Sequence, residues 1–276
     1  MLAVNLLASL VAMFLLVAPI GEVPAAHPDR DRAPAGIRVG TFNVDRDRGY
    51  DAWRRTVVAF RGHVDVAGLQ EVDTARKRHF LSAGGRWGAY ARTPGRDDNP
   101  VVWDRHVFRR TGAGAVRIDG RRGSSYATLV RLVHRRTGTP YAVLNVHLAW
   151  GHGPAQRLHR REQLAGLARA AGREEAAGRV VLVVGDFNVN HRNEQRDGRS
   201  GSPSRRLRPA GLVSAWESER LRPDGGSSTR GAGYIDQVWA PARARGVRVL
   251  RGLSGGQHHP VVARYVVPTG GQHPAE

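Results

Sequence analysis

Two polar side chains at the end of one apolar run could together bind a metal-bound phosphate. The run Val180–Val184 predicts a buried strand, and Asp186 and Asn188 follow closely after it. A carboxylate orients a water molecule or a cation, and an amide donates a hydrogen bond to a phosphate oxygen. Taken alone, the same segment also suits an ordinary turn, in which Asp and Asn are common.

Five further polar motifs bear on this choice. Four of them lie within or at the end of an apolar, strand-like run and the last precedes one: Thr41-Phe42-Asn43, Leu69-Gln70-Glu71, Asn145-Val146-His147, Ile235-Asp236 and His258-His259-Pro260. Burying one unpaired neutral polar group costs roughly 2 to 7 kcal/mol, and a charge costs more. Six unrelated burials of polar groups would each carry that cost, so we expect the six motifs to form one shared site.

In this order the motifs resemble those of the endonuclease/exonuclease/phosphatase superfamily, the group of deoxyribonuclease I, abasic-site endonucleases, neutral sphingomyelinases and inositol polyphosphate 5-phosphatases. The resemblance extends from about Ile37 to Val267. It implies a metal-dependent hydrolase of phosphoester bonds, in which an activated water attacks in line with the scissile bond. It also implies a sandwich of sheets and helices with the active site at one end of the sheets.

The resemblance further implies that Glu71 coordinates Mg²⁺ or Mn²⁺, with Asn43 alongside. Hard oxygen ligands, few in number and supplemented by water, suit Mg²⁺. The superfamily usually has Asp directly before the histidine that corresponds to His258, and this sequence has Gln257 there. Because that difference removes a negative charge, we expect one functional metal ion.

Four residues correspond to acid–base groups of the superfamily. His258 would act as general base or polarise the phosphate, and Asp236 would fix its tautomer. His147 would protonate or stabilise the leaving oxygen, and Asp186 would orient or deprotonate the attacking water. The sequence leaves open whether Asp186 or His258 takes the proton.

Two asparagines complete the predicted site. Asn188 would hold the phosphate, and Asn145 belongs to the same phosphate-binding group, supporting the site from behind. Successive strand residues face opposite ways, so we expect His259 at the surface or in packing rather than in the site. We expect a surface position for three histidines without an identifiable partner, His152, His159 and His191.

Helical and strand-like patterns predict the elements that must position these residues. Helices are predicted over 51–60, from the spacing of its apolar residues, and over 156–177. The predicted strands are 37–40, 64–69, 100–103, 115–118, 127–133, 141–148, 180–184, 234–240, 247–250 and 261–266. Two strand-rich halves with helices predict an α/β fold: a four-layer α/β/β/α sandwich of two packed mixed β-sheets flanked by helices. We expect the arginine-rich segment 190–209 to be a solvated loop beside the site.

The chain divides into four predicted segments. Residues 1–26 contain an apolar run followed by small residues, which predicts an export signal, although the run is long enough to leave an uncleaved membrane anchor open. We expect 27–36 to be a disordered leader, 37–268 the endonuclease/exonuclease/phosphatase domain and 269–276 a flexible tail. Cysteine is absent, which excludes disulfides and favours bacterial export to a secreted location.

The charge points to the class of substrate. The formal net charge is +19 at pH 7, and a field of this size favours polyanions. We therefore expect a monomeric nuclease that hydrolyses DNA or RNA. Two alternatives stay open: a phospholipase C, sphingomyelinase or inositol-phosphate phosphatase that recognises an anionic lipid head group, and a non-catalytic polyanion-binding protein. An exposed aromatic hairpin would favour the lipid, but Trp150 and Trp216 are isolated.

Overall fold

The structure is a computed structural model that describes residues 36–91, 99–119, 125–194, 201–218, 227–231, 233–253 and 256–267. The predicted export signal, the tail and all but the last residue of the predicted leader lie outside the described residues. That last residue, Gly36, begins the first strand instead. Among the described helices, none is both long and apolar enough to cross a membrane.

The elements run along the chain in the order β1 Gly36–Asn43, α1 Tyr50–Arg61, β2 Val66–Gln70, α2 Ala75–Ser82, β3 Trp87–Tyr90, β4 Val101–Asp104, β5 Phe108–Arg117, β6 Tyr126–His134, β7 Pro140–His147, α3 Pro154–Ala176, β8 Val180–Asp186, the 3-10 helix η1 His191–Asn193, α4 Pro203–Leu207, the 3-10 helix η2 Arg208–Ala210, β9 Val213–Ser214, α5 Ala215–Ser218, β10 Asp236–Ala240, β11 Gly246–Val249 and β12 Val261–Val266.

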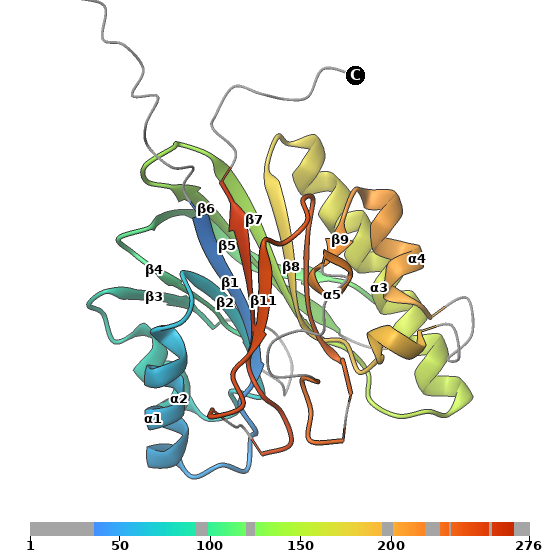
Figure 1. The fold of residues 1–276 in the computed structure, drawn as a ribbon, viewed down its shortest axis with the longest axis horizontal. Coiled ribbons are helices and arrows are strands. Elements are labelled where there is room, and N and C mark those ends of the chain that lie inside the picture. The colour runs from blue at the N-terminus through green and yellow to red at the C-terminus, as the bar shows by residue number, and fades with distance from the viewer. Residues whose placement is uncertain are drawn as a thin grey trace, which may run out of the picture. The chain divides into compact units, whose positions relative to one another are not determined.

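The strands form two six-stranded sheets (Figure 1), in the orders β11-β12-β1-β2-β4-β3 and β5-β6-β7-β8-β10-β9. Both sheets are mixed, because β1 runs parallel to β2 and β7 runs parallel to β8, whereas the outer pairs are antiparallel. Helices α1 and α2 lie against the first sheet, and α3 and α4 lie beside the second. The predicted four-layer sandwich is therefore confirmed.

Three apolar cores hold these layers together, and β8 explains why its sequence is apolar throughout. Leu182 and Val184 point into the core between the two sheets, whereas Val181 and Val183 point into the core beneath α3. A strand covered on both faces needs apolar side chains at consecutive positions. The third core lies between α1 and the first sheet, and Trp53 is one of its fully buried residues.

The structure extends and corrects the predicted elements. The two predicted helices and the predicted strands are present with boundaries shifted by a few residues, except that β5 begins seven residues earlier than predicted. Helix α2 was not predicted, because its sequence buries only Lys77 and Leu81 and has little apolar pattern. The segment 190–209 was predicted to be a loop, but its described residues include η1, α4 and most of η2. Capping by Asn190 and Ser202 explains two of these turns, since each side chain accepts from a backbone N–H.

Candidate active site

The strand register brings the predicted site residues together from both sheets. In the first sheet, Asn43 ends β1, and Glu71 follows the end of its parallel neighbour β2. In the second sheet, Asp186 ends β8 and has two direct register partners, His147 on β7 and Asp236 on β10. Residues that are directly opposite on neighbouring strands lie within contact distance of each other. The order of the strands therefore explains why motifs distant in sequence converge.

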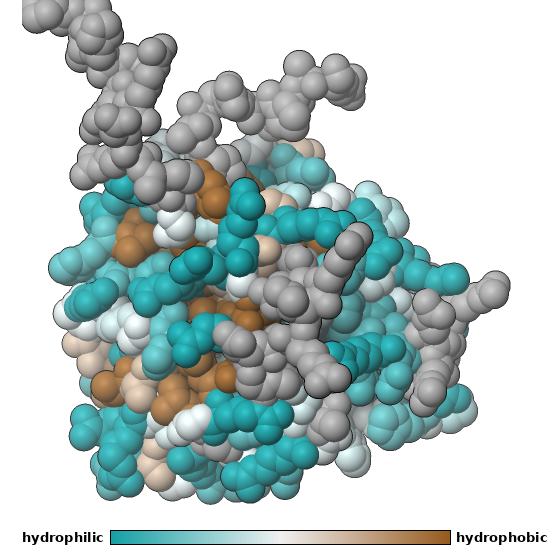
Figure 2. All heavy atoms as spheres, in the orientation of Figure 1, coloured by the Kyte–Doolittle hydropathy of each residue, from teal (hydrophilic) through white to brown (hydrophobic). Residues whose placement is uncertain are grey.

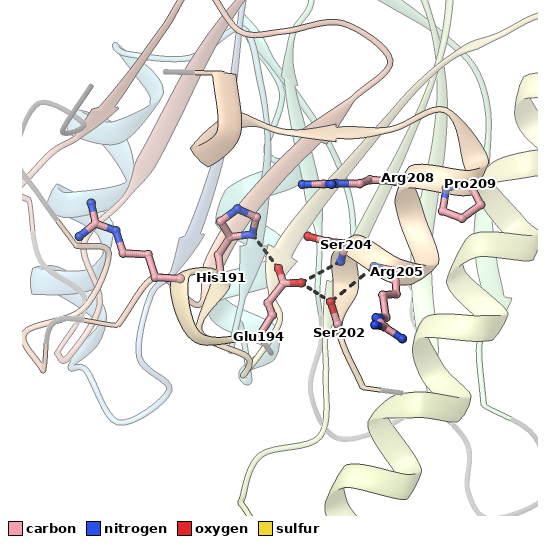
Figure 3. Close-up of a pocket in the computed structure, with 8 residues that line it drawn as sticks. His191, Glu194, Ser202, Ser204, Arg205, Arg208 and Pro209 are labelled. Atoms are coloured by element: carbon pink, nitrogen blue, oxygen red, sulfur yellow. Dashed lines mark hydrogen bonds and ion pairs between the residues drawn. The ribbon is translucent and has the colours of Figure 1, made fainter. Parts of the chain in front are cut away.

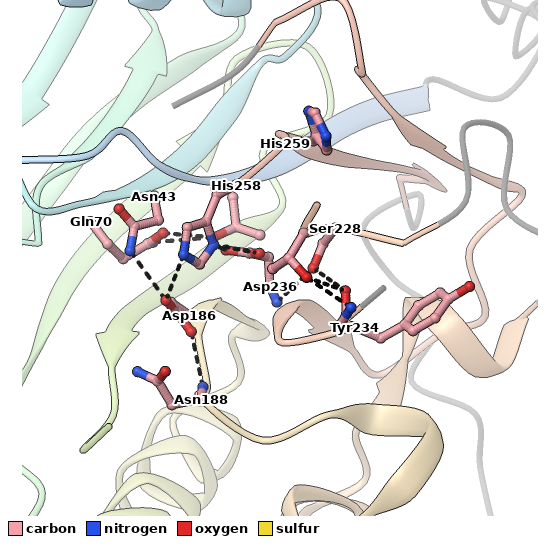
Figure 4. Close-up of polar contacts among 12 residues, drawn as sticks. Asn43, Gln70, Asp186, Asn188, Ser228, Tyr234, Asp236, His258 and His259 are labelled. Atoms are coloured by element: carbon pink, nitrogen blue, oxygen red, sulfur yellow. Dashed lines mark hydrogen bonds and ion pairs between the residues drawn. The ribbon is translucent and has the colours of Figure 1, made fainter. Parts of the chain in front are cut away.

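Six of the eight predicted residues line one pocket of about 560 Å³: Asn43, Glu71, His147, Asp186, Asn188 and His258. Asp236 does not line the pocket but is hydrogen-bonded to His258 behind it (Figure 4). Asn145 does not line it either. The pocket thus combines carboxylate, amide and imidazole groups in one place.

Glu71 presents its carboxylate from a left-handed backbone conformation. Its φ is 64°, which is uncommon for a residue with a side chain and is often found at functional sites. Asn43 Nδ2 donates to Glu71 Oε1 at 2.8 Å, and the backbone N–H of Arg46 donates to Oε2 at 3.0 Å. Burial acts to raise the pKa of Glu71, but these two hydrogen bonds and the nearby positive groups lower it below its ordinary value. Glu71 is therefore an ionised carboxylate.

His258 and Asp236 form a buried pair. His258 Nδ1 lies 2.9 Å from Asp236 Oδ2, and the backbone N–H of Asp236 donates to Ser228 Oγ at 3.2 Å. Burial alone would lower the pKa of His258, but Asp236, with help from other carboxylates of the site, raises it to about 9. Burial also raises the pKa of Asp236, although the His258 cation opposes that change. The contact with Asp236 therefore favours the protonated form of His258 at neutral pH.

Asp186 connects the groups from the two sheets. Its Oδ2 accepts from Asn43 Nδ2 at 3.2 Å and lies 3.6 Å from His147 Nε2 and 3.7 Å from His258 Nε2. Its Oδ1 accepts from the backbone N–H of Asn188 at 2.9 Å. Asn188 has a φ of 51°, and its Nδ2 donates to Leu148 O at 2.9 Å, which fixes the amide at the pocket wall. One carboxylate is thus surrounded by two imidazoles and two amides.

Asn145 lies behind the pocket and joins the two sheets. It is fully buried, and its Nδ2 donates to Leu69 O at 2.8 Å and to Pro100 O at 3.0 Å. Its Oδ1 accepts from Gln70 Nε2 at 2.7 Å. Because no part of its side chain reaches the pocket, the structure does not support the predicted contact with a phosphate. The predicted supporting position is the one that Asn145 occupies.

The residues on either side of His258 differ from it in position. His259 is buried away from the cluster (Figure 4), and its Nδ1 lies 3.4 Å from Leu253 O, in agreement with the packing position predicted for it. Gln257 is exposed and is not among the residues that line the pocket. A charge at position 257 would therefore influence the pocket from outside it.

The sequence did not identify several residues of the pocket wall. Ser125, Trp150, His159 and Gln163 all line the pocket. His159 was expected at the surface without a partner, but its Nε2 lies 3.1 Å from Ser125 Oγ. A helical spacing of four residues between His159 and Gln163 was the available signal, since residues at i and i+4 share one face of a helix.

The donor set fits a divalent cation held by Glu71 with Asn43 alongside. Glu71 supplies an ionised carboxylate in the pocket, and Asn43 supplies an amide next to it. As oriented, Asn43 presents its nitrogen to the carboxylates, so coordination by its oxygen requires the amide to turn over. Asp186, Asp236 and His258 also bring possible ligand atoms within 4.8 Å of one another, but the hydrogen bond between His258 and Asp236 identifies those two as a proton-sharing pair.

A second cavity, of about 700 Å³, lies along η1, α4 and η2 (Figure 3), and none of the predicted site residues line it. The buried carboxylate of Glu194 lines it, lies 2.7 Å from His191 Nδ1 and accepts hydrogen bonds from Ser202 Oγ and the Ser204 backbone N–H. His191, expected at the surface without a partner, therefore has one. Four arginines of segment 190–209 are described; Arg192, Arg205 and Arg208 line this cavity, whereas Arg206 lines neither this cavity nor the pocket of Asp186.

The comparison with known families agrees with this geometry. The model of the Endonuclease/Exonuclease/phosphatase family matches residues 40–262, which is most of the chain and includes every predicted site residue. The chain belongs to this family. As a member of the Endonuclease/Exonuclease/phosphatase family, it is a hydrolase of phosphoester bonds. Compared by sequence with curated proteins, it has no significant match.

Solved structures with the same fold include other members of the Endonuclease/Exonuclease/phosphatase family. A family protein from Bacteroides thetaiotaomicron has a TM-score of 0.68 at 15% identity, covering 88% of this chain and 99% of that one. D. rerio TDP2 complexed with single strand DNA product has a TM-score of 0.65 at 13% identity, covering 83% and 98%. A mannosyl-6-phosphatase of B. thetaiotaomicron has a TM-score of 0.64 at 16% identity, covering 82% and 98%. At these identities the likeness concerns the fold.

Proposed function

We propose that this protein is a metal-dependent nuclease that hydrolyses phosphodiester bonds of DNA or RNA. The observation that carries the proposal is the convergence of Glu71, Asp186 and His258 in one pocket of a phosphoester hydrolase with a net charge of +19. A long polyanionic substrate is attracted by such a field at many phosphates, whereas a substrate with a single phosphate, or one with a zwitterionic head group, gains less from it. The complex of D. rerio TDP2 with single strand DNA product adds support from the same fold.

In this proposal each residue acts on the phosphate or on the attacking water. Asp186 orients the water and accepts its proton, because it is the carboxylate between the two histidines. His258, held protonated by Asp236, donates to a phosphoryl oxygen and stabilises the charge that develops there. His147, across the pocket on β7, protonates or stabilises the leaving oxygen.

Two further residues prepare the site for the substrate. Asn188 holds the phosphate from the wall formed by the end of β8. Glu71, with Asn43 alongside, would hold one Mg²⁺ or Mn²⁺, which supplies Lewis-acid polarisation of the phosphoryl oxygens when bound.

The alternative substrates have less support. A lipid head group would favour an exposed apolar surface, but in the described residues the exposed large hydrophobic side chains are only Val58, Trp150 and Val266, on separate elements. The mannosyl-6-phosphatase with the same fold keeps a sugar phosphate as a candidate. A non-catalytic polyanion-binding role would leave the assembled acid–base groups without a use.

The test is an activity assay of the protein on single-stranded DNA, RNA, plasmid DNA, sphingomyelin and mannose 6-phosphate, each with Mg²⁺, Mn²⁺ or EDTA. We expect cleavage of DNA or RNA with Mg²⁺ or Mn²⁺ and none with EDTA. Glu71→Gln should reduce the cleavage rate by on the order of 100-fold, since second-shell changes alone lower metal affinity or activity by about 10- to 100-fold. Glu175→Gln, at an exposed position near the end of α3, is the matched control.

Each contrary result has a defined meaning. Cleavage that persists in EDTA would exclude the metal mechanism. Phosphocholine release, or phosphate release from mannose 6-phosphate, without cleavage of nucleic acid would replace the nuclease with the corresponding alternative. Binding of nucleic acid without turnover of any ester would support the non-catalytic role.

We also propose that the protein is exported in bacteria and acts as a monomer outside the cytoplasm. The support is the apolar run Leu2–Ile20 and the small residues up to Ala26. Mass spectrometry of the protein recovered from the medium of an expressing bacterium should give a chain that begins at about residue 27. Recovery of the intact chain with the membrane fraction would support an anchor, and recovery from the cytoplasm would contradict export.

A further inference from the structure

Trp150 is the most exposed large hydrophobic side chain of the described residues. It is 79% exposed, compared with 52% for Val58 and 37% for Val266. Isolated exposed hydrophobic residues are common and need no explanation by themselves. Trp150, however, lines the same pocket as Asp186 and His258, so its indole lies at the rim of the active site.

The loop that carries Trp150 is fixed on both sides by buried side chains of α3. Gln163 Oε1 accepts from the Ala149 backbone N–H at 2.9 Å. The Arg160 guanidinium donates to Ala149 O at 2.8 Å and also to Gly151 O. Both α3 side chains are buried, at 2% exposed for Gln163 and 1% for Arg160. The fold thus holds the backbone directly before and directly after Trp150, so the exposure of the indole is a property of an ordered loop.

Hydrogen-bonding groups of the pocket belong to the same arrangement. Gln163 Nε2 donates to Ser125 Oγ at 3.0 Å, and that hydroxyl lies 3.1 Å from His159 Nε2. Ser125 and His159 both line the pocket. A single buried residue, Gln163, therefore positions both the indole loop and the polar wall.

On the basis of the proposed nuclease function, we infer that Trp150 stacks on an unpaired nucleobase that adjoins the scissile phosphate, with Ser125 and His159 facing the edge of that base. A flat, exposed ring on an ordered loop is suited to stacking, because little conformational entropy is lost when the base binds. Every nucleobase has a π-face, so this subsite recognises the presence of a base without selecting its identity. The scissile phosphate of the substrate would then be bound inside the pocket while the adjoining base is bound at the rim.

The experiment compares two single-stranded substrates with the same number of phosphates: an oligothymidylate and an oligomer of tetrahydrofuran abasic residues. We expect Trp150→Ala to lower kcat/KM for oligothymidylate by about 5- to 150-fold, the range for loss of one base–aromatic stack, and to leave the abasic oligomer unchanged. Trp150→Phe keeps an aromatic ring and should retain most of the activity. Val58→Ala, an exposed position on α1, is the control that should alter neither substrate.

A binding measurement separates this inference from the proposed function. In EDTA, oligothymidylate should quench the fluorescence of the unmodified protein in a saturable way, the abasic oligomer should not, and Trp150→Ala should abolish the quenching. If neither oligomer is cleaved, the nuclease proposal fails while quenching still decides the stacking. Equal effects of Trp150→Ala on both oligomers, or no effect on either, would overturn the stacking inference even if the protein is a nuclease.

Discussion

In the pocket, the contact between His258 and Asp236 favours a positive charge on His258. Burial penalises both ionised groups, but it penalises them less when they remain in contact as an ion pair. The 2.9 Å contact therefore keeps His258 protonated in a position where burial alone would neutralise it. A protonated His258 is a hydrogen-bond donor rather than a base, so in the proposed mechanism Asp186 is the group that accepts the proton of the water.

Asp236→Asn should lower the pKa of His258 from about 9. The substitution removes the carboxylate that raises this pKa most and leaves burial, which lowers it, opposed only by the more distant carboxylates of Asp186 and Glu71. The measurement is an NMR titration of the His258 ring in EDTA, with the signal assigned from a His258→Gln spectrum. Asp51→Asn, on the exposed side of α1, is the control that should leave the titration unchanged.

The direction in which activity changes with pH follows from the protonation of His258. If the reaction needs protonated His258, activity should be retained at neutral pH and fall as the pH rises through about 9. In Asp236→Asn this loss should move to lower pH. An activity that instead increases through pH 9 in the unmodified protein would identify His258 as the general base and contradict the assignment to Asp186.

At the scale of the elements, the contact between β2 and β7 fixes the site residues of the first sheet in position relative to those of the second sheet. A Cβ built on Gly68 of β2 would lie 2.3 Å from Asn145 Oδ1 on β7, so the two strands approach too closely for any side chain. Asn145 uses that proximity to bond Gln70 and two backbone carbonyls of the first sheet. Buried polar groups of this kind are costly to leave unpaired, so the network fixes one position of the sheets.

Gly68→Ala should therefore destabilise the protein by about 1 to 3 kcal/mol, the usual range for overpacking a core. Urea unfolding measures the loss, and activity should fall with it because Asn43 and Glu71 belong to the displaced sheet. Gly114→Ala is the matched control, since a Cβ there would meet no atom within 4 Å, and its effect should stay within about 0.5 kcal/mol. Equal stability of the two variants would show that the sheets can separate to accept the methyl group.

An element or site residue can be predicted from the sequence when its signal is a local pattern, but not when its position results from packing between distant segments. The apolar run of β8 and the polar residues at its end are local, so both the strand and Asp186 could be identified directly. Trp150 and His159 could not, because their place in the pocket results from α3 folding back over β7, which no local pattern encodes. Asn145 lies between these cases: its motif marked it as part of the site, but only the packing of the sheets shows that it lies behind the pocket.

On the scale of the whole molecule, the large positive net charge is the property that bears most directly on the proposed substrate. The face shown in Figure 2 is mainly hydrophilic, and apolar side chains appear there in small separate patches. The net charge of +19 is distributed mostly over arginines, and Arg192, Arg205 and Arg208 gather along the second cavity. Under the proposed nuclease function, such a surface would attract a polyanionic substrate over a wide area, and the pocket would select the phosphate to be cleaved.

Binding of single-stranded nucleic acid should consequently weaken steeply with salt. Each phosphate that the protein neutralises contributes about −0.7 to the slope of log K against log[salt], so contact with three or more phosphates predicts a slope steeper than about −2. Fluorescence anisotropy of the Glu71→Gln variant with a labelled oligonucleotide gives the slope without cleavage. An oligonucleotide with an uncharged methylphosphonate backbone is the control and should bind weakly and almost independently of salt. If the charged and uncharged backbones bind alike, the positive field does not serve nucleic-acid binding, and the substrate must be sought among esters that the pocket alone can recognise.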